Sequence, residues 1–183
     1  MLLKNVLRKK YLSLRKKKYY EVNKEYFLSL INFIKKKYKN KKINLGLYYP
    51  SNFELNIIKI LDFNYISNKN ILLPVIEENN QMNFFSWNKN EVLLVNKYGI
   101  LEPIKSEAKI PNIMIVPVLS FDSMKTRLGY GKGFYDRYLN KYLKKFNNIL
   151  TVGVAFSFQK YHKVPLEKND VKLNFILSEK GLY

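Results

Sequence analysis

Residues 127–139 read RLGYGKGFYDRYL, and their types and spacing suit the binding of a phosphate group. Glycine at alternate positions lets the backbone adopt positive φ angles and brings its N–H groups close to an anion; the glycines are Gly129, Gly131 and Gly133. Arg127 and Lys132 add two cations to the same stretch. The stretch is therefore a candidate phosphate-binding loop.

A helix is expected directly after these glycines. Aromatic residues recur every four positions from Phe134 to Phe146, which predicts a helix over residues 133–146. Its N-terminus would point at the loop, where the helix dipole favours an anion. Asp136 falls in the first turn, where a carboxylate could hold a magnesium ion that bridges phosphates.

An ordinary turn is the alternative interpretation of this stretch. Three alternating glycines match neither the P-loop pattern GxxxxGK[ST] nor the dinucleotide pattern GxGxxG. Asp136 could also only complement the helix dipole, or pair with Arg137 or Lys132. Three glycines, two cations and an acid directly after an apolar strand are more than a turn requires.

Helical and strand patterns alternate along the chain. Helices are expected at residues 2–16, 20–38 and near 52–62, and strands at 43–49, 71–76, 112–121, 149–156 and 173–178. This alternation predicts one α/β domain over residues 1–183, with three layers and an open, mainly parallel sheet flanked by helices. Ligands of such sheets bind beyond the carboxyl ends of the strands, so segments that follow different strands should converge on one site.

Composition limits the class of protein. The chain has 183 residues, 47% of them hydrophobic, and no Cys, which excludes disulfides. Its N-terminus lacks an apolar run long enough for a signal peptide or membrane span, so a cytoplasmic protein with no membrane partner is expected. A net charge of +19 is typical of nucleic-acid binding, but the lysines are spread over nearly every segment, and we expect no specific nucleic-acid partner.

The segment NIMIVPVLSFDSMKTRLGYGKGFYDRYL, residues 112–139, resembles the signature of the 5-formyltetrahydrofolate cyclo-ligases, also called methenyltetrahydrofolate synthetases. Lys4 and Arg8 stand at the spacing of that family's N-terminal Lys-x-x-x-Arg. Tyr130 departs from the pattern, because many members carry Arg there, and Asn169 stands where His is frequent. Other matching segments follow in the family's order: YYPSNFE (48–54), ILLPVI (71–76), the stretch from Met82 to Trp87, YGILEP (98–103), VGVAFSFQ (152–159) and VPLEKND (164–170).

The resemblance implies an enzyme that uses ATP and magnesium to cyclise 5-formyltetrahydrofolate to 5,10-methenyltetrahydrofolate, with release of ADP and phosphate through a phosphorylated formyl group. Arg127 and Lys132 would be catalytic, and we expect a monomer. The resemblance also implies three sets of binding residues: for ATP, Lys4, Arg8, Arg127, Gly129, Gly131, Lys132, Gly133 and Asp136; for the folate, Tyr49, Glu54, Tyr130, Phe134 and Tyr135; and for the metal, Asp136 and Asp170.

Local sequence leaves other roles open for some of these residues. Ser51 and Glu54 also fit a capping box at a helix start. Lys4 and Arg8 would lie on one face of a helix, where solvated charges are common. Phe84 and Trp87 are expected in the core, although a pteridine could stack on an aromatic face. His162 is expected in a polar loop without a catalytic role.

Two other functions remain as alternatives. A basic nucleic-acid-binding α/β protein would bind in a salt-sensitive way and without ATP. A different phosphotransferase or sugar-phosphate enzyme with the same glycine-rich loop would turn over ATP regardless of formylfolate.

Overall fold

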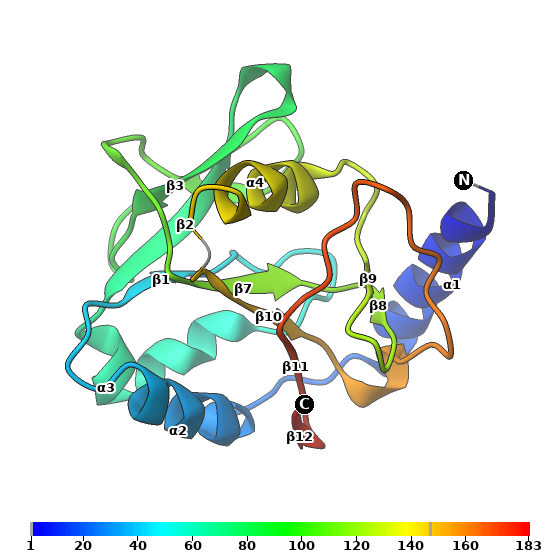
Figure 1. Cartoon of the computed structure of the whole chain (residues 1–183), viewed down its shortest axis with the longest axis horizontal. Coiled ribbons are helices and arrows are strands. Elements are labelled where there is room, and N and C mark those ends of the chain that lie inside the picture. Colours follow the sequence, from blue (N-terminus) through cyan, green and yellow to red (C-terminus); the bar gives the residue numbers. More distant parts are fainter. Residues whose placement is uncertain (1, 147) are drawn as a thin grey trace.

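The computed structural model describes residues 2–146 and 148–183. Its centre is a sheet of eight strands in the order β12-β11-β10-β7-β1-β2-β3-β6 (Figure 1). Five neighbouring strands are parallel: β1 (Asn44–Gly46), β2 (Asn70–Ile76), β7 (Ile113–Pro117), β10 (Leu150–Val154) and β11 (Phe175–Ser178). The edges are antiparallel, formed by β3 (Met82–Ser86) with β6 (Ala108–Lys109) on one side and β12 (Gly181–Leu182) on the other. The predicted α/β class with a mainly parallel sheet is confirmed.

Four strands are shorter than their apolar runs predict. The runs 149–156 and 173–178 pair only over β10 and β11. The run 43–49 pairs only over β1, and the run 112–121 divides after Pro117. Proline has no backbone N–H to donate to a ladder, and beyond it the chain leaves the sheet. There β8 (Ser120–Phe121) pairs with β9 (Arg127–Leu128) in a separate hairpin. A further hairpin, of β4 (Leu93–Val95) and β5 (Leu101–Pro103), was not predicted.

Helices cover both faces of the sheet (Figure 1). One face carries α4 (Phe134–Leu143), which ends three residues before the predicted helix does. On the other face lie η1 (Lys24–Phe27), α2 (Leu28–Lys37), η2 (Ile57–Asp62) and α3 (Asn64–Ser67). Two short 3-10 helices, η3 (Glu78–Asn80) and η4 (Ser157–Gln159), complete the elements that connect the strands.

Two helix predictions on this face were partly wrong. Helical structure in the segment 20–38 starts only at Lys24. In the segment 52–62, Asn52 and Phe53 have φ angles of 47° and 60°. That left-handed conformation is rare for residues other than glycine and does not start a right-handed helix. A 3-10 helix therefore forms only from Ile57.

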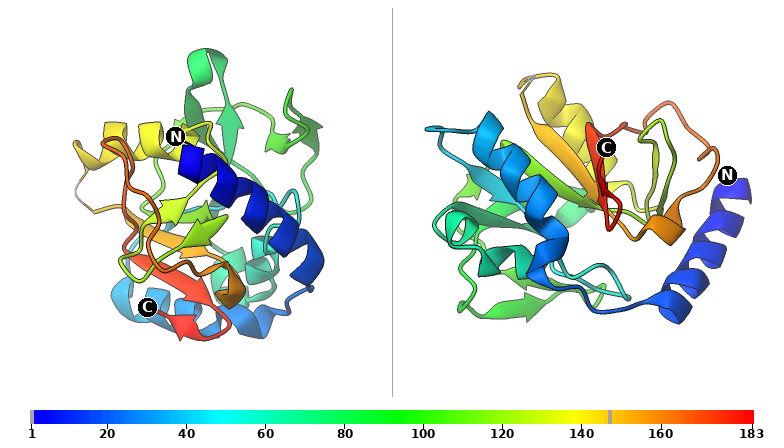
Figure 2. Two further views of the ribbon diagram at one scale, coloured as in Figure 1. Left: turned by 90° about the vertical axis from the view of Figure 1, so that its right-hand side faces the viewer. Right: turned by 90° about the horizontal axis from the view of Figure 1, so that it is seen from below.

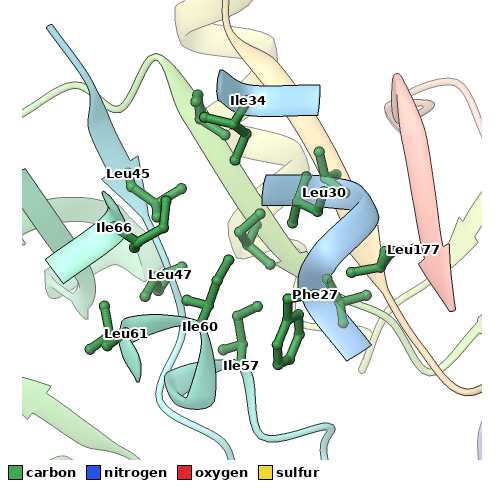
Figure 3. Packing of buried hydrophobic residues seen from close by; sticks show 14 of the residues in the cluster. Phe27, Leu30, Ile34, Leu45, Leu47, Ile57, Ile60, Leu61, Ile66 and Leu177 are labelled. Atoms are coloured by element: carbon green, nitrogen blue, oxygen red, sulfur yellow. The ribbon is translucent and has the colours of Figure 1, made fainter. Parts of the chain in front are cut away.

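The larger core lies between the sheet and this second layer (Figure 3). Phe27, Leu30 and Ile34 come from η1 and α2 and are fully buried against Ile57 and Ile60 of η2. Burial of one such side chain stabilises the fold by about 1.5–3 kcal/mol. On the opposite face, α4 is held by its own apolar residues against β3 and β7.

The first helix, α1 (Leu2–Lys18), lies beyond one end of the sheet (Figures 1 and 2). Leu7 and Tyr11 pack on Leu119, Leu128 and Val164, which belong to the hairpin and loop after the strands. Strand β1 has β2 on one side and β7 on the other, so the chain order reverses between β1 and β7. A crevice is expected beyond the carboxyl ends of strands at such a reversal, and α1 covers this end.

Candidate functional site

A cavity of about 860 Å³ lies beyond the carboxyl ends of β1 and β7. Its wall is formed by α1, the loop after β1, the glycine-rich loop, the start of α4 and the loop before β11. Every site residue predicted from the sequence lines it: Lys4, Arg8, Tyr49, Glu54, Arg127, Gly129, Tyr130, Gly131, Lys132, Gly133, Phe134, Tyr135, Asp136 and Asp170. The structure thus brings together residues from segments up to 166 positions apart.

The glycine-rich loop has the backbone geometry that its composition predicts at two of its three glycines. Gly131 has a φ of 94°, and Gly133, the N-cap of α4, has a φ of 69°. Arg8 lies against the loop: its Nε donates to the Gly129 carbonyl at 3.0 Å. A Cβ atom at Gly131 would lie 3.0 Å from the Arg8 guanidinium carbon. Gly131 is therefore needed both for its φ and for this close approach.

Arg127 and Asp136 form an ion pair in the wall. The Arg127 Nη2 lies 2.9 Å from Asp136 Oδ1, and only 4% of the Arg127 side chain is exposed. Val171 joins both groups, since its N–H donates to Asp136 Oδ1 at 3.1 Å and its carbonyl accepts from Arg127 Nη1 at 3.0 Å. The sequence-based alternative that Asp136 pairs with Arg137 or Lys132 is wrong.

Arg137 holds the other side of the loop. Its Nη2 donates to the Lys132 carbonyl at 2.8 Å and to the Asn80 carbonyl at 2.9 Å. The Lys132 side chain is exposed, with its Nζ 5.6 Å from the centre of the Tyr98 ring. The loop backbone is therefore tethered, while the Lys132 ammonium group is accessible at the cavity.

Lys4 projects from α1 to the loop before β11. Its Nζ lies 2.6 Å from Asp170 Oδ2 and 3.2 Å from Glu167 Oε2, and 7% of its side chain is exposed. The Glu167 N–H also donates to Asp170 Oδ2, at 2.7 Å. Lys4 and Arg8 therefore face the cavity and its wall, and the alternative of a freely solvated pair is wrong.

Glu54 is a buried carboxyl group beside the cavity, with 7% of the residue exposed. The Tyr130 hydroxyl donates to its Oε1 at 2.6 Å, and the Ser51 N–H donates to its Oε2 at 2.9 Å. Burial raises the pKa of Glu54, and the hydrogen bond from Tyr130 partly opposes this rise. The contact between Ser51 and Glu54 is the one a capping box would make, but residues 52–53 form a left-handed turn instead of a helix start.

Aromatic residues complete this part of the wall. The Tyr135 hydroxyl is buried without a hydrogen-bond partner among the described residues. Burial raises the pKa of Tyr135, so its hydroxyl keeps its proton at neutral pH and can donate to a ligand. Tyr49 packs edge-on against Trp87, which is 3% exposed. Phe84 is fully buried, so the prediction that Phe84 and Trp87 belong to the core is confirmed.

Comparisons with known proteins agree with one another. The model of the 5-formyltetrahydrofolate cyclo-ligase family matches residues 3–179. The chain belongs to that family. A 5-formyltetrahydrofolate cyclo-ligase of Haemophilus influenzae is 30% identical over 141 residues, 73% of this chain and 74% of the relative. The chain is thus classified with the cyclo-ligase enzymes, as its sequence predicted.

Solved structures of cyclo-ligase relatives share the fold. The 5,10-methenyltetrahydrofolate synthetase of Aquifex aeolicus superimposes with a TM-score of 0.75 at 29% identity and covers 98% of this chain and 91% of its own. A synthetase of Mycoplasma pneumoniae has a TM-score of 0.72 at 23% identity over 95% and 97% of the two chains, and supports the fold alone.

Whether this cyclo-ligase fold offers a magnesium site depends on Asp136 and Asp170. The described residues contain no group of three or more acidic or histidine side chains placed to hold a metal. Each of the two aspartates uses one carboxylate oxygen for its cation and a backbone N–H, and its other oxygen has no hydrogen bond to the described residues. Mg²⁺ is commonly held by one or two carboxylates together with substrate phosphates and water. The second oxygens of Asp136 and Asp170 fit a site of that kind, in which phosphate and water supply the remaining ligands, and do not fit a site made of ligands from the described residues alone.

Some lining residues were missed from the sequence. Tyr98 enters the cavity from the turn between β4 and β5, where Asn96 Oδ1 accepts from the Tyr98 N–H at 2.8 Å. Glu102 of β5 is buried, also lines the cavity, and accepts from the Ile76 N–H at 2.7 Å. The only sequence signal was the short segment YGILEP, to which no role was given.

His162 is exposed in a loop and does not line this cavity. Among the described helices, none is long and apolar enough to span a membrane.

Proposed function

We propose that the protein catalyses the ATP-dependent cyclisation of 5-formyltetrahydrofolate to 5,10-methenyltetrahydrofolate, with release of ADP and phosphate. The observation that carries this proposal is the convergence of the glycine-rich loop, its cations and a buried carboxyl group on one cavity in a chain of the cyclo-ligase family. The cavity volume of about 860 Å³ falls in the range of small-molecule and cofactor sites.

The glycine-rich loop is suited to the nucleotide. The backbone at Gly131 and Gly133 and the N-terminus of α4 provide N–H groups for phosphate oxygens. Lys132 carries an accessible ammonium group, and Arg8 lies against the loop. We assign ATP to this region, with Lys4, Arg127, Gly129 and Asp136 as further contacts or supports.

The folate is assigned to the region around Glu54. A carboxylate among aromatic rings can accept hydrogen bonds from ring N–H groups of a reduced pterin while the rings pack on its faces. Tyr135 adds a buried hydroxyl that has no hydrogen-bond partner in the described part of the chain and that a polar substrate atom could satisfy. Tyr49, Tyr130 and Phe134 supply further aromatic surface to the cavity.

In the proposed reaction the formyl oxygen attacks the γ-phosphorus, and the bond from that phosphorus to the bridging oxygen breaks to release ADP. The neighbouring amine nitrogen then attacks the formyl carbon, the carbon–oxygen bond breaks to release phosphate, and the amine loses its proton. Positioning and charge neutralisation carry most of the catalysis in phosphoryl transfer. Lys132 would neutralise charge on the moving phosphoryl group, and Arg127 would hold Asp136 and the loop in place.

Magnesium would be held by Asp136, Asp170 and phosphate oxygens, and would neutralise phosphate charge. We also propose a monomeric cytoplasmic enzyme without a specific nucleic-acid partner. Residues of one chain, from Lys4 to Asp170, line the cavity, which supports a monomer. The charge of +19 would attract both anionic substrates.

The test is a direct assay. Protein, magnesium-ATP and 5-formyltetrahydrofolate are mixed, and the ultraviolet absorbance of the methenyl product is followed over a range of pH and enzyme concentration. Absorbance should rise only when all components are present. No product under any of these conditions would reject the proposal; ATP turnover that ignores formylfolate would point to another phosphotransferase.

A further inference from the structure

Arg15 is a fully buried cation that does not line the cavity. It lies on α1, directly before a run of three exposed lysines, and only 1% of the residue is exposed. It shares the buried face of α1 with Lys4, Leu7 and Tyr11. Removal of a guanidinium group from water is costly unless its N–H groups find acceptors, so its contacts indicate what this burial serves.

Those contacts join the two loops that follow β1 and β7. Arg15 Nη2 donates to the Asn52 carbonyl at 2.7 Å and to the Tyr130 hydroxyl at 2.5 Å. The guanidinium carbon also lies 5.4 Å from the centre of the Tyr130 ring. Asn52 belongs to the left-handed turn that carries Glu54, and Tyr130 belongs to the glycine-rich loop. One side chain therefore tethers both walls at the reversal of the strand order.

The direction of these hydrogen bonds is determined by Arg15. A guanidinium group only donates hydrogen bonds and stays protonated in proteins. The Tyr130 oxygen must therefore accept from Arg15, and its single proton is directed to Glu54 Oε1, 2.6 Å away. The other oxygen of Glu54 accepts from the Ser51 N–H at 2.9 Å. Both carboxylate oxygens of Glu54 thus accept hydrogen bonds from groups that Arg15 holds. Arg15 contacts Tyr130 directly, and it holds Ser51 through the carbonyl of the neighbouring Asn52.

We propose that Arg15 is a positioning residue for the substrate, which holds Tyr130 and the turn at residues 51–54 so that Glu54 presents an oriented carboxylate to the cavity. This inference rests on the proposed function and deepens it, because the group that Arg15 orients is the one assigned to the folate. Arg15 does not touch the substrate itself. The Asn52–Phe53 turn has a strained backbone and Arg15 ties it to α1.

The positive charge of Arg15 also favours the ionised form of Glu54. Burial raises the pKa of Glu54, while Tyr130, Arg15 and Ser51 oppose the rise. The other titratable groups that face Glu54 are Tyr48, in the segment after β1, and Tyr135 on α4; burial raises the pKa of both, so they stay neutral. Without Arg15 the carboxyl group would lose its facing cation and would be protonated to higher pH.

The experiment compares Arg15→Met, which removes the charge, with Arg15→Lys, which keeps it but cannot reproduce the planar fork. Tyr11→Phe is the control for attachment of α1, because it removes the 3.1 Å hydrogen bond to the Lys160 carbonyl outside the cavity. Lys17→Met is the control for loss of one exposed charge on the same helix. For each variant, kcat/KM for 5-formyltetrahydrofolate is measured against pH, together with KM for ATP and the melting temperature.

Arg15→Met should lower kcat/KM for the formylfolate about 10- to 100-fold and change KM for ATP little. The acidic limb of its pH profile should move to higher pH, whereas Arg15→Lys should keep the limb in place. Neither control should move it. If Arg15→Met does not fold, Arg15→Lys, Tyr130→Phe and their double variant carry the test, and the double variant should lose little more than the worse single variant.

Two failures are distinguishable. An active wild type whose Arg15 variants behave like Lys17→Met, or whose losses at Arg15 and Tyr130 simply multiply, would overturn the positioning role and leave the cyclisation intact. A wild type that makes no methenyl product would overturn the proposed function, and this inference with it.

Discussion

The guanidinium of Arg127 and the carboxylate of Asp136 form an ion pair with 2.9 Å between Nη2 and Oδ1, closed by the backbone of Val171. Arg127 lies in β9, Asp136 lies in the first turn of α4, and Val171 precedes β11. The pair therefore connects three segments around the cavity. Asp136, which the sequence predicts as a metal ligand, thus also has a structural role in the site.

Asp136→Asn should lower stability by about 1.5–3 kcal/mol, because the buried Arg127 loses a charged partner. The sequence alone predicted almost no change in melting temperature, since an exposed acid in a first helical turn contributes only about 0.3–1 kcal/mol. If Asp136 also helps to hold magnesium, the half-saturating magnesium concentration for turnover should rise. Thermal melting and magnesium titration of activity measure the two effects.

Glu107→Gln provides the matched control, because Glu107 is exposed and outside the cavity wall. It should leave both quantities unchanged. An Asp136→Asn variant with normal magnesium dependence would remove Asp136 from the metal site, whatever its stability.

Gly131→Ala should reduce stability and raise the apparent KM for ATP. Its φ of 94° is unfavourable for a residue with a Cβ atom, at a cost of roughly 1–2 kcal/mol. The new methyl group would also lie 3.0 Å from the Arg8 guanidinium carbon, so Arg8 would have to shift by a few tenths of an ångström, which weakens its hydrogen bond to the Gly129 carbonyl. Urea unfolding and steady-state kinetics give the two values.

Gly129→Ala serves as the stability control, because a Cβ there meets nothing within 4 Å and the backbone is not left-handed. Its free energy of unfolding should stay within about 0.5 kcal/mol of the wild type. An equal loss in the free energy of unfolding for Gly129→Ala and Gly131→Ala would contradict the role assigned to the Arg8 contact.

Much of the site could be predicted because the rule that locates it is topological. The apolar runs that became β1 and β7 indicated parallel strands, and ligands of such sheets bind beyond their carboxyl ends. From that rule alone, the segments around Glu54 and Arg127 are predicted to lie at one site. The rule did not predict partners, which depend on side-chain packing: Asp136 pairs with Arg127, nine positions away, and not with Arg137 or Lys132.

Arg15 shows a different limit. The three lysines that follow it, Lys16 to Lys18, are exposed, and no local pattern separates one buried cation from a run of exposed ones. Helical spacing from Lys4 and Arg8 puts Arg15 on the same face of α1, but this was not recognised, and the acceptors of its hydrogen bonds lie 37 and 115 positions away. The turn at Asn52 and Phe53 was missed for a related reason: positive φ at two residues other than glycine is set by tertiary contacts.

Glu54→Gln should change how stability depends on pH. Burial raises the folded-state pKa of Glu54 above the ordinary value of 4.5, so between the two values the folded protein binds more protons than the unfolded chain. The stability of the wild type relative to Glu54→Gln should therefore fall as pH rises above about 4.5, and level off above the folded-state pKa. Urea unfolding of both proteins at a series of pH values measures this difference. A relative stability that increases with pH would mean that hydrogen bonds from Tyr130 and Ser51 outweigh burial.

Lys132→Ala should impair catalysis far more than Lys36→Ala, although both lysines are exposed. Lys132 lies between two glycines at the cavity, and Arg137 fixes its carbonyl, so its ammonium group can reach a phosphate without a rearrangement of the loop. Lys36 lies in the last turn of α2, outside the cavity wall. Loss of a charge-assisted hydrogen bond of about 1.5–3 kcal/mol corresponds to a fall in kcat/KM of roughly 10- to 150-fold for Lys132→Ala. Both variants remove one charge, so measurements at matched ionic strength cancel the effect of net charge. Similar small losses in the two variants would mean that diffuse positive charge attracts the nucleotide and that this loop does not bind its phosphates.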